Sequence, residues 1–78
     1  MSSAPDMLDT RGLRCPLPVI RLETRLRRMA EGARVRIMAD DPIAAIDIPH
    51  FARQGGHTCL RLPSEDDKLC VFEVTRGP

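Results

Sequence analysis

Aromatic side chains are nearly absent from this 78-residue chain, which has two Phe and neither Trp nor Tyr. A core therefore has to be built from aliphatic side chains. A domain of this size buries only about 60% of the surface that its unfolded chain exposes, which leaves no room for a large enclosed cofactor cavity. We expect its chemistry at the surface. RNA recognition by stacking of bases on aromatic rings is also disfavoured.

Cysteine is the second scarce residue, with only Cys15, Cys59 and Cys70. Three cysteines are too few for a disulfide-linked secreted scaffold, which indicates a reducing compartment. The chain does not open with the basic segment and apolar run of a signal peptide, and no apolar run approaches the roughly 18 residues of a membrane span. We therefore expect a cytoplasmic protein with no membrane partner. A single domain is predicted over residues 1–78, with residues 1–5 as a frayed tail.

The signatures of metal and cofactor sites are missing as well. The cysteines form no C-x-x-C pair, and His50 and His57 match no ligand spacing. Neither a phosphate-binding glycine loop nor a serine nucleophile motif is present. We predict that the chain uses neither a metal nor a cofactor. A pairing of Cys15 with a histidine stays open, although both histidines are expected to be solvated.

Charge is distributed unevenly, although the net charge of the chain is only +1. Residues 11–36 carry eight arginines and two glutamates, which leaves six net positive charges. Arg21, Arg25 and Arg28 fall on one face of a predicted helix. That face is either a solvated surface or a docking site for an acidic partner protein or for RNA.

Apolar periodicity and turn residues predict six elements in the order β-α-β-α-β-β. Strands are expected at residues 6–10, 33–39, 57–62 and 69–74, and helices at residues 16–30 and from residue 42 to Gly55-Gly56. The second helix is expected to break after one turn and to restart with Asp47 as its N-cap, because Pro49 lies too deep for an uninterrupted helix. The predicted fold class is α+β, a two-layer sandwich with two helices on one face of a four-stranded mixed sheet.

The run Asp9–Pro18, which reads DTRGLRCPLP, places Cys15 where a loop turns into the first helix. Backbone N–H groups of the first turn, the positive end of the helix dipole and the charges of Arg11 and Arg14 all favour a thiolate. The alternative is a small buried apolar residue, which is the usual state of a free cysteine. We predict an exposed, partly ionised Cys15.

Alternation along the last two strands separates the other two cysteines. Cys70 shares a face with Phe72 and Val74 and is expected in the core, whereas Cys59 is expected on the outer face of the sheet. The two cysteines are too misaligned for a disulfide. A redox sensor based on Cys15 therefore has no evident resolving thiol.

The run around Cys15 resembles the signature of the TusA-like, or SirA-like, sulfur-carrier family. The segments Asp40–Pro42, Asp47–Pro49 and Gly55–His57 are similar to the second half of that family, so that the resemblance extends over residues 8–74. It implies a two-layer sandwich like the C-terminal domain of a bacterial translation initiation factor. It also implies that Cys15 accepts a sulfane sulfur as a persulfide and passes it to a partner protein.

Donors in that family include cysteine desulfurases and rhodanese-type proteins, and acceptors feed tRNA thiolation, molybdenum-cofactor sulfuration or sulfur oxidation. Some members carry a second cysteine in the second helix, where this chain has Phe51 and Ala52, so a single-cysteine relay is expected. The residues expected to support Cys15 are Arg11, Gly12, Arg14, Pro16 and Pro18. We expect a monomeric persulfide carrier of the sulfurtransferase type rather than a free-standing multiple-turnover enzyme. The competing hypothesis is a binding or regulatory module in which the arginine-rich first helix carries the function.

Overall fold

The computed structural model describes residues 5–78, so the predicted frayed tail lies outside the described residues except for Pro5. The elements are β1 (Asp6–Asp9), α1 (Leu17–Arg27), β2 (Arg34–Ala39), α2 (Ala44–Gln54), β3 (Thr58–Leu62) and β4 (Cys70–Thr75). One sheet in the order β1-β2-β4-β3 contains all four strands, with β1 parallel to β2 and the other two pairs antiparallel. The predicted fold class is confirmed.

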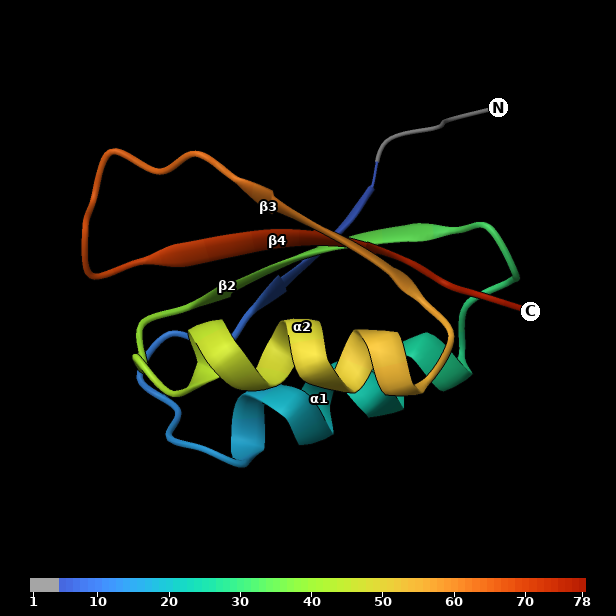
Figure 1. Cartoon of the computed structure of the whole chain (residues 1–78), viewed down its shortest axis with the longest axis horizontal. Coiled ribbons are helices and arrows are strands. Elements are labelled where there is room, and N and C mark those ends of the chain that lie inside the picture. Colours follow the sequence, from blue (N-terminus) through green and yellow to red (C-terminus); the bar gives the residue numbers. More distant parts are fainter. Residues whose placement is uncertain (1–4) are drawn as a thin grey trace.

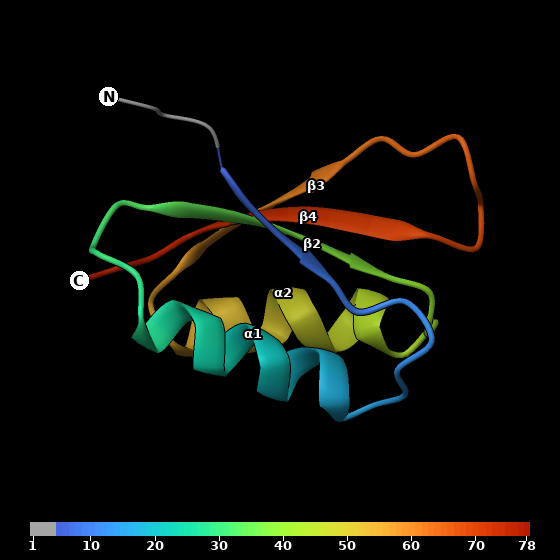
Figure 2. The same cartoon turned by 180° about the vertical axis from the view of Figure 1, so that it is seen from behind.

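Both helices cover the same face of the sheet and leave its other face open (Figure 1 and Figure 2). They run side by side in the same direction, so their N-termini lie at one end of the molecule. This arrangement follows from the parallel pairing of β1 and β2, because each helix begins after a strand that runs toward that end. The loop that carries Cys15 and the loop that precedes α2 therefore meet there.

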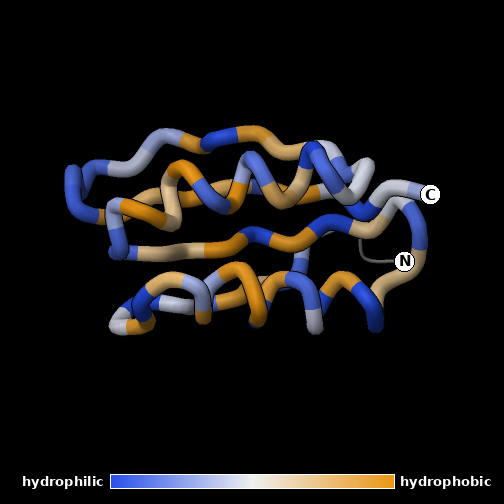
Figure 3. Tube along the Cα trace, turned by 60° about the horizontal axis from the view of Figure 1, so that its bottom comes forward, coloured by the Kyte–Doolittle hydropathy of each residue, from blue (hydrophilic) through white to orange (hydrophobic). Residues whose placement is uncertain are grey.

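The core lies between the helices and the sheet and is aliphatic apart from Phe72 and Cys70. In β2 and β4, buried and half-buried residues alternate, as expected for strands with one face against the core. Figure 3 shows the same alternation of apolar and polar segments along the trace. The predicted first helix is confirmed, and its Leu22 and Leu26 are buried against the sheet, although α1 extends from Leu17 to Arg27 rather than over residues 16–30.

The predicted break in the second helix is wrong. Helix α2 is continuous from Ala44 to Gln54 and contains Pro49. The ring of a proline removes one intrahelical hydrogen bond, a cost of about 3 kcal/mol in a helix interior. Burial of Ala44, Ile48 and Ala52 against the sheet offsets that cost. Asp47 therefore lies inside a continuous helix and does not act as an N-cap.

Cys70 is buried as predicted, but the prediction for Cys59 is wrong. Antiparallel pairing places Cys59 opposite Val74, which is fully buried, and directly opposed residues share a face of the sheet. Cys59 consequently packs against the core, and Leu60 points to the open face, where 58% of it is exposed. Apolar residues also occupy the outer side of β3, so the hydrophobic alternation in the sequence indicated the wrong face of this strand for the core.

Neither helix in the part of the chain that the structure describes is long and apolar enough to cross a membrane.

Candidate functional site

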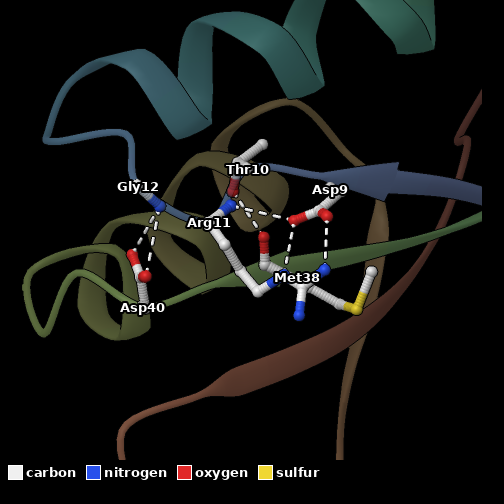
Figure 4. A network of polar contacts seen from close by, with 6 residues as sticks. All are labelled: Asp9, Thr10, Arg11, Gly12, Met38 and Asp40. Carbon is white, nitrogen blue, oxygen red and sulfur yellow. Dashed lines mark hydrogen bonds and ion pairs between the residues drawn. The ribbon is translucent and has the colours of Figure 1, made fainter.

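The loop that leads to Cys15 is anchored to the end of β2 (Figure 4). Thr10 is fully buried, and both its N–H and its hydroxyl donate to the carbonyl oxygen of Met38, at 2.8 and 2.5 Å. The N–H of Gly12 donates to both carboxylate oxygens of Asp40, at 2.9 and 3.1 Å. Gly12 has a φ of +85°, which only glycine adopts readily. Gly12, which was predicted to support Cys15, thus forms a turn of defined conformation in the loop that leads to it.

Arg11 is engaged by a carboxylate rather than by the thiol. Its Nε and Nη2 donate to the two oxygens of Asp9, at 2.9 and 2.7 Å (Figure 4). These bonds, with a third from the Arg11 N–H, lower the pKa of Asp9 to about 2. The pair closes the turn between β1 and the Cys15 loop, and Arg11 contributes to the shape of the loop.

The backbone of Cys15 is held by a carboxylate from the loop before α2. The Cys15 N–H donates to Oδ2 of Asp41 at 2.6 Å, and the Ile43 N–H donates to Oδ1 at 3.0 Å. These two bonds keep the pKa of Asp41 below its ordinary value, and the charge of Arg14 adds to the effect. Asp41 is buried and ionised, and it joins the two loops at the end of the molecule where both helices begin.

The thiol of Cys15 faces a second carboxylate. Sγ donates to Oδ2 of Asp47, in the first turn of α2, at 2.9 Å. This hydrogen bond raises the pKa of the thiol, and partial burial and the charges of Asp47 and Asp41 raise it further. The prediction of a stabilised thiolate is therefore wrong, since the nearest charges are negative. The predicted exposure is only partly correct, because Cys15 is half-buried.

The start of helix α1 provides fewer free N–H donors to the Cys15 thiol than the sequence indicates. It begins at Leu17, with Pro16 as the N-cap residue and a cis peptide bond between Cys15 and Pro16. The N–H of Leu17 donates to the carbonyl oxygen of Arg14 at 2.8 Å and is not available to sulfur. Pro18 is fully buried, so its role is to pack the start of α1 against the core.

The arginines predicted to dock a partner have different environments. Arg25 is half-buried and forms an ion pair with Asp6 of β1. Arg21 and Arg28 are exposed, and within residues 5–78 neither of them forms an ion pair. The exposed part of the predicted docking face is therefore limited to Arg21 and Arg28, while Arg14 is exposed beside Cys15.

Four exposed aliphatic side chains lie at the starts of the two helices, next to Cys15. They are Leu17, Ile20, Ile43 and Ile46, each between 43% and 71% exposed. We refer to these four residues as the apolar patch. Exposed apolar side chains clustered at one end of a small domain are typical of a surface that contacts another protein.

The histidines and the other cysteines lie away from this site. His50 is exposed, whereas His57 is half-buried beside the C-terminal end of α2, where its Nδ1 accepts the Gly77 N–H at 2.9 Å. The expectation that His57 is solvated is thus wrong. Burial raises the pKa of both Cys59 and Cys70, and all three cysteines are free. Among residues 5–78, no cluster of His, Cys, Asp and Glu is arranged to hold a metal ion.

Sequence reasoning missed the two residues that contact Cys15 most directly, Asp41 and Asp47. Both have the residue type and position of helix caps, and this local interpretation concealed their long-range role. A signal was nevertheless present, because the segment Asp40–Pro49 carries five acidic or proline residues, more than a helix start requires. Tertiary contact, 26 and 32 residues away along the chain, gives the two carboxylates their function.

Comparison with known proteins identifies the family and the fold of the chain. Residues 6–76 match the family described as "Sulfurtransferase TusA". The structure is also similar to that of a SirA-like protein from Desulfitobacterium hafniense, with a TM-score of 0.80 and 26% sequence identity. That similarity covers 92% of this chain and 97% of the other. The chain belongs to the TusA family of sulfurtransferases.

Proposed function

We propose that this protein is a sulfur carrier that accepts a sulfane sulfur on Cys15 as a persulfide and transfers it to a partner protein. The observation that carries the proposal is the position of Cys15: its backbone is tied to Asp41, and its sulfur is half-exposed where both helices begin. A sulfur in a deep pocket could not be passed between two proteins. Membership of the TusA family supports the same conclusion.

The chemistry of this role needs one reactive sulfur and no oxidant. The Cys15 sulfur attacks the outer sulfur of a donor persulfide, a new S–S bond forms, and the S–S bond of the donor breaks. The cysteine sulfur of the donor leaves as a thiolate, and the Cys15 proton is released. The donor thereby changes from a persulfide to a thiol, and Cys15 changes from a thiol to a persulfide. Transfer to an acceptor thiolate is the same reaction in the opposite direction.

The partners are proteins on both sides of the relay. The donor is of the cysteine desulfurase or rhodanese type, and the acceptor delivers the sulfur to tRNA thiolation, molybdenum-cofactor sulfuration or sulfur oxidation. The apolar patch supports such docking, because it surrounds the start of both helices with exposed aliphatic surface. Arg14 and Arg21 would add attraction for an acidic partner.

Sulfur loading of single-cysteine variants tests this proposal. The protein is incubated with polysulfide, and its intact mass is measured with and without a reducing agent. Wild type is expected to gain one sulfur that the reductant removes, Cys15→Ser is expected to gain none, and Cys59→Ser is expected to load like wild type. The reductant separates a persulfide from a sulfinic acid, which has nearly the same mass but is not reduced. Equal loading of Cys15→Ser and wild type would contradict the proposal.

A further inference from the structure

The proton on Cys15 Sγ is shared with a carboxylate that belongs to a different element of the fold. Sγ donates to Asp47 Oδ2 at 2.9 Å, across 32 residues of sequence. The contact is held in place from the backbone side, because Asp41 binds the Cys15 N–H at 2.6 Å and the Ile43 N–H at 3.0 Å. These bonds hold the backbone of Cys15 beside the loop that leads into α2, so that its side chain lies within reach of Asp47.

The empty form of the protein is therefore held as a thiol. The charged groups that face the sulfur are Asp47 from α2 and Asp41 from the loop before it, and both disfavour a negative charge on sulfur. The positive charge of Arg14 acts on Asp41 and lowers its pKa. Because the thiolate is the nucleophile, a raised pKa lowers the fraction of reactive thiolate on the empty Cys15 near neutral pH.

Formation of a persulfide on Cys15 changes the chemical group that lies next to the Asp47 carboxylate. Once the outer sulfur of a donor is bonded to Sγ, the Cys15 proton is gone and Sγ has no hydrogen to donate. The acidic group is now the terminal sulfur, which lies one S–S bond, about 2 Å, beyond Sγ. A persulfide is a stronger acid than its parent thiol, because the adjacent sulfur stabilises the anion, and repulsion from Asp47 weakens with distance.

We propose that Asp47 holds the proton on the empty Cys15 and slows its reactions, and loses this hold when a sulfane sulfur is bound, so that the loaded form of the carrier is the more reactive of the two. The inference rests on the proposed function, since it requires a loaded form. Asp47 acts here on the reacting sulfur itself. Its effect is to protect the empty thiol from oxidation while leaving the persulfide free to react with an acceptor.

The test compares iodoacetamide alkylation of the empty and polysulfide-loaded forms as a function of pH. It uses the Cys59→Ser background, so that the half-buried Cys59 does not contribute. Intact mass separates alkylated thiol from alkylated persulfide, and a reductant removes only the second. The variant is Asp47→Asn, and the control is Glu31→Gln, which removes the same charge from an exposed carboxylate in the turn after α1, outside the Cys15 site.

In Asp47→Asn the thiol of the empty form is expected to titrate at lower pH. Each unit by which its pKa falls raises the thiolate fraction about tenfold and lowers the intrinsic nucleophilicity about threefold, so that alkylation at pH 7 accelerates about threefold. Alkylation of the loaded form is expected to change by less than a factor of about two, and Glu31→Gln is expected to match its parent in both forms. Asp47→Ser provides a second removal of the carboxylate if the asparagine variant fails to fold.

Three results would overturn the inference. The first is an unchanged rate and titration of the empty form in Asp47→Asn and Asp47→Ser. The second is an equal acceleration of the empty and loaded forms, which would show that Asp47 does not distinguish them. The third is a wild-type protein that takes up no sulfur at all, which overturns the proposed function as well, whereas in the first two the protein still loads and the proposed function stands.

Discussion

Two carboxylates from the beginning of the second helical segment hold Cys15, one at its N–H and one at its Sγ. Sequence reasoning predicted a positive electrostatic environment for this cysteine, and the structure shows the opposite. The arginines that precede Cys15 in the chain are directed elsewhere: Arg11 pairs with Asp9, and Arg14 acts on Asp41. Proximity along the chain was therefore a poor guide to the charges that surround the sulfur.

Asp41 gives a pH-dependent prediction at the residue scale. Its pKa is lowered in the folded protein by the N–H groups of Cys15 and Ile43. Its contribution to stability is therefore fully present above the unfolded pKa of about 3.9 and is lost as the pH falls through the lower folded value. Asp41→Asn is expected to lower the urea midpoint at pH 7, and the gap to wild type is expected to narrow below about pH 4.

Urea titrations monitored by circular dichroism at several pH values check this prediction. The exposed Asp40→Asn serves as the control and is expected to shift the midpoint less than Asp41→Asn does. A gap between wild type and Asp41→Asn that stays the same from pH 7 to pH 3 would mean that the charge of Asp41 contributes nothing to folding.

Among the elements, α2 departs most from what its sequence indicates. It remains helical through Pro49 because its buried face packs against the sheet, a stabilisation that no local propensity contains. This continuity also determines the site. In a helix broken after one turn, Asp47 would serve as a cap for the second half, and its carboxylate would not be available to Cys15.

Pro49→Ala is expected to stabilise the protein by about 1–3 kcal/mol, because it restores the intrahelical hydrogen bond that proline removes. Thermal or urea unfolding measures this gain. Pro42→Ala is the control, since Pro42 is exposed and precedes α2, and we expect it to change stability by less than about 1 kcal/mol. A Pro49→Ala variant no more stable than Pro42→Ala would indicate that the proline already fits this helix without cost.

The whole molecule combines a small core with an open sheet face. Phe72 of β4 is the one buried aromatic residue among residues 5–78, and it lies opposite Ile37 on β2 and Arg61 on β3. A domain of this length has a free energy of unfolding of only about 4–12 kcal/mol. Loss of one large core side chain is therefore a substantial fraction of the total.

Phe72→Ala is expected to cost about 3–5 kcal/mol, through lost burial and the cavity that remains. Leu60→Ala, on the exposed side of β3, is expected to cost less than about 1 kcal/mol. Urea unfolding of both variants provides the comparison. Similar losses for the two would show that the open face of the sheet is covered in solution.

The amino-acid sequence by itself determined the order of the elements, the two-layer fold and the position of Cys15 just before the first helix, because each depends on local signals: apolar periodicity, turn residues and one short motif. Tertiary structure alone decided that Cys59 faces the core, that α2 passes through Pro49 and that Asp47 meets the thiol. These outcomes depend on strand register and on contacts between segments about 30 residues apart. Their energies come from burial and from facing charges, which local patterns do not contain.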